Sequence, residues 1–194
     1  MKKFFCLMAA MTMLLSACAY AESVPSKTTD DMIQIEIVTD ETAGAESAAF
    51  IVPVQEGDAA NADILAVSAA EIQKIAASAT VEEYFGEVKD TKGSTIRLQD
   101  LLEADQLNCH EFFPVIAGGF EQQDGATSVR MKVAAPYAAG EKVLVLIGLA
   151  AENGIAWTAC PAEVDDAGQV LVVLENQLIL QIQANKALMA IVSK

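Results

Sequence analysis

The sequence is poor in the residue types on which most catalytic and metal sites depend. It has one histidine, His110, and four cysteines among 194 residues. A Ser-His-Asp or Cys-His mechanism would need His110 as its general base. Cys109 beside it is badly placed as the nucleophile, because neighbouring residues of a strand point to opposite faces. Zinc takes about four ligands, whereas Cys109, His110 and Cys160 supply at most three, so we predict no catalytic, cofactor-binding or metal-ligating residue.

Positive charge is also scarce. The chain has 12 Lys and Arg against 27 Asp and Glu, which gives a formal net charge of −15. Nucleic acids and anionic lipid surfaces are bound through clusters of Lys and Arg, so the composition argues against both as partners. The acidic pairs Asp30-Asp31, Glu82-Glu83 and Asp165-Asp166 do not follow the alternating ligand loop of an EF-hand, and we interpret them as solvated turns.

Long apolar runs are missing from the body of the chain. Its longest run, Val143 to Ala151, has the length of a strand, far short of the about 20 residues that a membrane-spanning helix needs. The amino terminus is different: two lysines precede an apolar stretch at 4–15 and a region of small residues, which is the three-part pattern of a secretory signal. We predict that residues 1–21 are an export signal and that the rest works outside the inner membrane.

Two cleavage sites compete at the end of this signal. Ala19-Tyr20-Ala21 is an A-x-A site that would release a soluble chain beginning at Glu22. Leu15-Ser16-Ala17-Cys18 instead has the form of a bacterial lipobox, after which Cys18 would carry the lipid. Several acyl chains on Cys18 would anchor the protein firmly. We prefer lipidation of Cys18, with free secretion as the alternative.

The cysteines of the body allow one disulfide. Cys6 and Cys18 lie in the signal, which leaves Cys109 and Cys160. In an exported domain these two can form a bridge worth about 2–4 kcal/mol. The alternative is that both are free thiols buried as small apolar side chains.

The first part of the body is expected to have little regular structure. Residues 22–49 are predicted to be a flexible tether with one strand, in which Ile33, Ile35 and Ile37 alternate with polar residues. Residues 50–108 are predicted to mix strands and helices. Short strands are expected at 50–54 and 64–67.

Two helix starts in this mixed segment follow from capping-box spacing, in which a hydroxyl residue precedes an acidic residue by three positions. Ser68 with Glu71 predicts one start, and Thr80 with Glu83 predicts the other.

Residues 109–194 are predicted to form an antiparallel β-sandwich. Pro114 suits an edge strand or a bulge, and Asn153-Gly154 is a strong signal for a type I′ hairpin turn. Residues 175–186 are ambiguous, and we expect a short helical connection there. The expected strands are 112–116, 128–133, 142–149, 155–158, 169–174 and 187–193.

Several of these segments resemble a known kind of module. Pro136-Tyr137, the strand that follows Gly140, the hairpin with Trp157, and the closing strand Ala187 to Ser193 are similar to the immunoglobulin-like β-sandwich of uncharacterised exported bacterial surface proteins. The resemblance implies a mainly β fold, an antiparallel immunoglobulin-like sandwich with a short helical segment before it, in an extracellular setting. It implies no functional residue.

Together these observations predict a non-enzymatic extracytoplasmic protein that binds or presents a surface, tethered to the cell membrane or secreted. Its partner would be a protein or a carbohydrate at the cell surface, with membrane contact only through the lipid. Trp157, Tyr137 and Tyr84 could stack on a sugar ring, although a tryptophan beside a hairpin usually fills a core. The alternatives are a small hydrolase that uses His110 and an acidic accessory subunit that docks on a basic exported partner.

Overall fold

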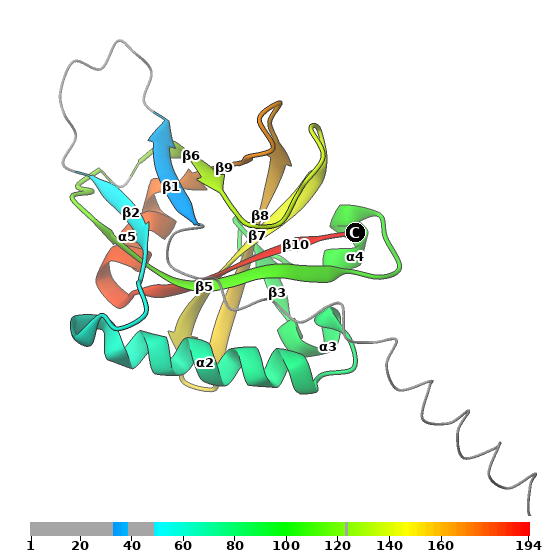
Figure 1. Cartoon of the computed structure of the whole chain (residues 1–194), viewed down its shortest axis with the longest axis horizontal. Coiled ribbons are helices and arrows are strands. Elements are labelled where there is room, and N and C mark those ends of the chain that lie inside the picture. The colour runs from blue at the N-terminus through cyan, green and yellow to red at the C-terminus, as the bar shows by residue number, and fades with distance from the viewer. Residues whose placement is uncertain (1–32, 39–48, 123) are drawn as a thin grey trace, which may run out of the picture.

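The computed structural model describes residues 33–38, 49–122 and 124–194, which form a ten-stranded sheet with helices packed against it (Figure 1). The predicted export signal, Cys18 and most of the tether lie outside these residues. None of the described helices is both long and apolar enough to cross a membrane.

The helices and strands alternate in the first half, whereas strands dominate the second. The strands are β1 (Gln34–Val38), β2 (Phe50–Pro53), β3 (Val88–Asp90), β4 (Thr95–Ile96), β5 (Asn108–Gly118), β6 (Ala126–Lys132), β7 (Lys142–Ala151), β8 (Gly154–Val164), β9 (Val170–Glu175) and β10 (Ala187–Ser193). The helices are η1 (Ala59–Asn61), α2 (Ala62–Ala77), α3 (Val81–Phe85), α4 (Leu98–Leu102) and α5 (Asn176–Asn185).

The sheet curls until its two ends lie side by side. Its strand order is β1-β6-β9-β8-β7-β10-β5-β2, with the β3–β4 pair attached to β8. All pairs are antiparallel except β3 with β8. The end strands β1 and β2 are neighbours in space (Figure 1), so the sheet is nearly a barrel.

The central strands are buried on both faces because the barrel is filled inside and covered outside. Val143, Val145 and Ile147 of β7 point into an inner cluster, to which α5 adds Leu178 and Ile182. This explains why the segment 142–149, predicted as one strand, is apolar at nearly every position.

The outer face of the same strands carries a second core, which we call the outer cluster. Leu144 and Leu146 alternate with the inward residues of β7 and lie beneath α2, α3 and α4, together with Trp157. The ring of Trp157 makes edge contacts with Tyr84, Phe85 and Phe112 at centroid distances of 6.2, 4.9 and 5.9 Å. Trp157 therefore fills a core, as its position beside a hairpin predicts.

The prediction of a mainly β, largely antiparallel fold is confirmed. An immunoglobulin-like sandwich is not, because the strands form one curled sheet instead of two stacked ones. The segments before residue 109 contribute β1 to β4, so they join the same sheet as the strands of 109–194. The expected helical connection at 175–186 is confirmed as α5.

One of the two predicted helix starts is wrong. Residues 64–67 are helical, not a strand, and Ser68 lies in the middle of α2, where it is buried. The actual start is set upstream by Asp58, whose carboxylate accepts a hydrogen bond from the Ala60 N–H at 3.0 Å and so caps η1. At Thr80 the capping box is confirmed: its hydroxyl oxygen accepts from the Glu83 N–H at 3.1 Å.

Pro114 does not mark an edge, since β5 pairs with β10 on one side and β2 on the other. The Pro114 carbonyl accepts from the Val54 N–H at 2.8 Å, where the β2 ladder ends. The N–H that proline lacks would point the same way as this carbonyl, toward Val54. Pro114 therefore cannot return a hydrogen bond to Val54, which fits its position at the end of the β2–β5 ladder.

The hairpin predicted at Asn153-Gly154 exists with a different turn. Ala151 pairs with Gly154, so the two turn residues are Glu152 and Asn153. Gly154 has φ of 128°, whereas Asn153 keeps a negative φ, and the turn is not type I′.

Candidate functional site

A groove, which we call the α2 groove, lies between α2 and the edge of the barrel. It has a cavity volume of about 310 Å³. One wall is a stripe of α2 residues spaced three or four positions apart, which places them on one helix face. The facing wall comes from Ile33, the stretch after β2, and the middle of β5. The lining residues are Ile33, Pro53, Val54, Gln55, Glu56, Leu65, Ser68, Ala69, Ile72, Gln73, Phe112, Phe113 and Pro114.

Helix α2 is connected to α3 and to the end of α5 by polar side chains. Glu71 is 8% exposed, and its carboxylate accepts from the Lys74 ammonium at 2.7 Å and from the Tyr84 hydroxyl at 2.9 Å. At the helix start, the Lys186 ammonium reaches Asp63 at 2.8 Å and so connects α2 to the end of α5. The groove is therefore bounded by elements that are anchored independently of any ligand.

A second hollow of about 690 Å³, which we call the seam hollow, lies next to the α2 groove between β1 and β2. It is lined by the first residues of β1, the end of β2, Gly57 and Asp58. Ile33, Pro53, Val54, Gln55 and Glu56 line both hollows. The two hollows therefore have part of their lining in common.

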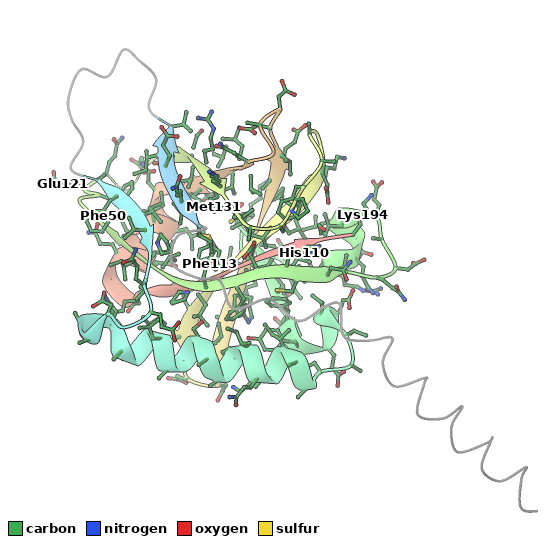
Figure 2. The ribbon with its side chains drawn as sticks, viewed as in Figure 1. Phe50, His110, Phe113, Glu121, Met131 and Lys194 are labelled. Carbon is green, nitrogen blue, oxygen red and sulfur yellow. The ribbon has the colours of Figure 1, made fainter. Side chains whose placement is uncertain are left out.

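His110, the general base of the alternative hydrolase hypothesis, lies outside the groove, nearer the start of β5 than the groove residue Phe113 (Figure 2). Its Nε2 is 3.1 Å from the Ser193 hydroxyl, and its ring meets Tyr137 edge-on at a centroid distance of 5.7 Å. Burial lowers the pKa of His110 against the opposing charge of Glu141, which favours the neutral ring. Ser193 is 2% exposed, so its hydroxyl is not presented to a substrate.

The cysteines do not provide a nucleophile for His110 either. Cys109 belongs to the outer cluster and Cys160 to the inner cluster, so the two lie on opposite sides of the sheet as free thiols. Burial raises the pKa of each thiol to about 12. A thiol with such a pKa is protonated at neutral pH and is a poor nucleophile. The disulfide that the sequence allows is not formed in this structure, where both thiols are free.

A buried carboxyl group next to His110 was not singled out by the sequence analysis. Glu111 is 1% exposed, and its Oε1 accepts from the N–H groups of Ala134 and Ala135 at 2.9 Å each. Its Oε2 has no hydrogen-bond partner among the described residues. The signal in the sequence is a charged residue directly before the apolar run that begins at Phe112.

Glu111 is expected to make stability depend on pH. Burial raises its pKa above the ordinary 4.5, and the two backbone hydrogen bonds only partly oppose this. The folded state therefore binds the proton more tightly than the unfolded state. The stability due to this proton is fully present below pH 4.5 and is lost as the pH rises through the folded pKa. As the pH rises from 4.5 through the folded-state pKa of Glu111, the free energy of unfolding of the wild type should therefore fall relative to that of Glu111→Gln.

This difference is measured by urea unfolding of both proteins across the pH series. Gln keeps an oxygen acceptor for the two N–H groups, and the nearby titratable groups Cys109, His110, Tyr137 and Glu141 are common to both proteins. Exposed Glu163→Gln is the matched control and should leave the pH dependence of the wild type unchanged. Parallel curves for wild type and Glu111→Gln would contradict the assignment.

The aromatic side chains that might stack on a sugar are not arranged as a platform. Trp157 is 4% exposed, and the Tyr84 hydroxyl is engaged by Glu71. Tyr137 packs against the inner cluster at the His110 end of β5. None of the three lines the α2 groove.

The described residues contain no group of three or more His, Cys, Asp and Glu side chains placed to hold a metal ion. Comparison with known proteins adds no functional assignment: no protein-family model, no curated protein and no solved structure matches the chain.

Proposed function

We propose that this chain is a non-enzymatic, extracytoplasmic binding protein whose ligand lies in the α2 groove. The observation that carries the proposal is a concave, mostly apolar hollow of about 310 Å³ with a few polar groups on its walls. Small-molecule sites typically have this composition and about 300–1,000 Å³ of volume. Apolar side chains from α2, β5 and the end of β2 would supply affinity. The Ser68 hydroxyl and the amides of Gln55 and Gln73 would orient the ligand.

A hydrolase that uses His110 is less well supported. The hydroxyl beside His110 belongs to a buried serine, and both thiols of the body are buried with raised pKa values. The His110 end of β5 also contributes no residue to the α2 groove. Binding therefore accounts for the described hollow with fewer assumptions than catalysis does.

Filling the groove should abolish binding of an uncharged apolar probe. N-phenyl-1-naphthylamine, a dye that fluoresces in apolar surroundings, is expected to bind the wild-type chain saturably. Ala69 is exposed on the groove wall of α2, so Ala69→Phe places a ring in the hollow without entering either core. We expect the dissociation constant of the dye to be at least about tenfold higher for Ala69→Phe than for the wild type, which is a loss of about 1.4 kcal/mol of binding free energy.

Ala70→Phe is the matched control for this titration. Ala70 is the next residue of α2, is also exposed, and does not line the groove, so both variants change helix propensity equally. Wild-type affinity is expected for Ala70→Phe. If Ala69→Phe and Ala70→Phe bind the dye with equal affinity, the dye binds elsewhere and the proposed site is refuted.

The extracytoplasmic part of the proposal is supported by the sequence pattern of residues 1–21, with Cys18 as the lipid-bearing residue. Cells fed radiolabelled palmitate are expected to label the wild-type chain and not Cys18→Ala, which should appear in the medium. Cys6→Ala is the control, because Cys6 lies earlier in the signal and should not affect labelling. Unlabelled wild type in the medium would favour free secretion, whereas unprocessed chain in the cytosol would contradict export.

A further inference from the structure

Ser68 differs from the other polar residues of the α2 groove in its burial. Gln55, Glu56 and Gln73 are exposed, whereas Ser68 is 4% exposed. An exposed polar group bonds to water whether or not a ligand lies beside it, so it selects little. A buried hydroxyl depends on the groups in contact with it. Among the polar groups of the groove, the Ser68 hydroxyl is therefore the one that can discriminate most between ligands.

Within the described residues, the Ser68 hydroxyl makes no hydrogen bond. A serine in a helix can donate to the carbonyl four positions earlier. Ser78, at the C-terminal cap of α2, does so: its hydroxyl donates to the Lys74 carbonyl at 2.9 Å. Ser68 does not make the equivalent bond to Ile64. Its hydroxyl can therefore pair with a polar atom of a ligand that lies in the groove.

Apolar side chains flank Ser68 in both directions along the helix. Leu65 lies three positions before it and Ile72 four positions after it, so the three residues form one stripe on the groove face of α2. Phe112 and Phe113 of β5 contribute to the facing wall. The hydroxyl therefore lies between two apolar stretches of the wall, and a ligand that pairs with it needs apolar groups on both sides of its polar atom.

We propose that the ligand of the α2 groove is a small apolar molecule with a hydrogen-bonding oxygen in the middle of its body, and that Ser68 is the residue that selects it. This inference rests on the proposed function, because it assigns a ligand class to the same groove. A site with a buried hydroxyl discriminates against an analogue that lacks the matching oxygen, since the hydroxyl then stays unpaired. An amphiphile with its polar group at one end would pair with Ser68 only by placing that end among apolar side chains.

The test is displacement of N-phenyl-1-naphthylamine by two ligands with the same carbon skeleton. Dicyclohexyl ketone has a carbonyl oxygen between two apolar rings, and dicyclohexylmethane has a methylene group in place of the carbonyl. The Ser68 hydroxyl can donate to the ketone and has no acceptor in the hydrocarbon. Each dissociation constant is corrected for the affinity of the dye in the same variant. The quantity compared is the dissociation constant of the hydrocarbon divided by that of the ketone, which we call the ketone preference.

Ser68→Ala should lower the ketone preference by about fivefold relative to the wild type, which is the effect of one hydrogen bond. Alanine keeps the Cβ atom and favours the helix, so this variant is expected to fold. Ser78→Ala is the matched control, because it removes a serine hydroxyl at the end of the same helix without changing the groove wall. The ketone preference of Ser78→Ala should equal that of the wild type.

The outcomes separate this inference from the one on which it rests. Dye binding that Ala69→Phe does not weaken defeats the proposed function and this inference together. If Ala69→Phe weakens dye binding but the ketone preference is the same in the wild type and Ser68→Ala, only the role of Ser68 is refuted. A ketone preference that falls equally in Ser78→Ala also refutes that role, because the loss would then come from the helix and not from the groove wall.

Discussion

Trp157→Ala should lower the free energy of unfolding by about 3–5 kcal/mol, the usual cost of removing a large buried aromatic side chain. Trp157 is 4% exposed in the outer cluster and contacts the rings of Tyr84, Phe85 and Phe112. The cavity left behind would lie between the sheet and α3, and the four-ring arrangement would lose its centre. Because Trp157 is the only tryptophan of the chain, unfolding should be followed by circular dichroism and not by tryptophan fluorescence.

An exposed apolar residue on the same sheet provides the comparison. Val173 of β9 is 55% exposed, and Val173→Ala should change the free energy of unfolding by no more than about 0.5 kcal/mol. A similar small change for Trp157→Ala would mean that the outer cluster does not hold the helices to the barrel.

Gly148→Ala should destabilise the fold by about 1–3 kcal/mol through overpacking. A Cβ atom at Gly148 would lie 2.5 Å from Cζ3 of Trp157 and 2.7 Å from Cγ2 of Ile155. The backbone of β7 there is extended and open to any residue, so crowding, not conformational strain, is the expected cause. Thermal and urea unfolding of the single variant measure this cost.

The source of the crowding can be isolated with a second substitution. Trp157→Phe removes the Cζ3 and Cη2 atoms of the indole that the new methyl group would meet. In the Trp157→Phe background, Gly148→Ala should therefore cost less, with an interaction energy of about 0.5 kcal/mol or more. Additive costs would show that the methyl group and the indole do not compete for the same space.

The sequence predicts the strands of the second half well because the apolar residues in these strands are the ones that are buried. Val143 to Leu149 is apolar throughout, and this part of β7 is buried on both faces. The helix at 175–186 is also recovered, although its amphipathic pattern is weak. Closure of the barrel could not be predicted, because it depends on β1 and β2, short strands whose pairing with distant β6 and β5 leaves no local signature.

The errors in the first half come from reading local signals without their tertiary context. Ser68 has the spacing of a cap, yet the helix already begins before it, because Asp58 and the alanines that follow favour an earlier start. Residues 64–67 have the sequence of a strand because Ile64, Leu65 and Val67 make a short apolar run, although Val67 is 38% exposed in α2. A short apolar run of this kind also occurs in helices, and periodicity alone does not separate the two.

The candidate site could not be predicted from the sequence, because it also depends on tertiary contacts. Its walls come from Ile33, the end of β2, one face of α2 and the middle of β5, which are separated by up to 81 positions along the chain. None of these residues has unusual chemistry on its own. One wall of the groove forms only when α2 packs along β5 and brings Ser68, Ala69 and Gln73 to face it. The types of these residues do not indicate that contact.

The central claim, a ligand site under α2, is tested most directly by mapping backbone amide chemical shifts by NMR during titration with N-phenyl-1-naphthylamine. The account predicts that the largest shifts fall on residues that line the groove, among them Val54, Ser68, Ala69 and Ile72. Amides around His110 and Tyr137 should change little, since they line no part of this hollow. Shifts concentrated at that end of β5, with the α2 amides unmoved, would contradict the account.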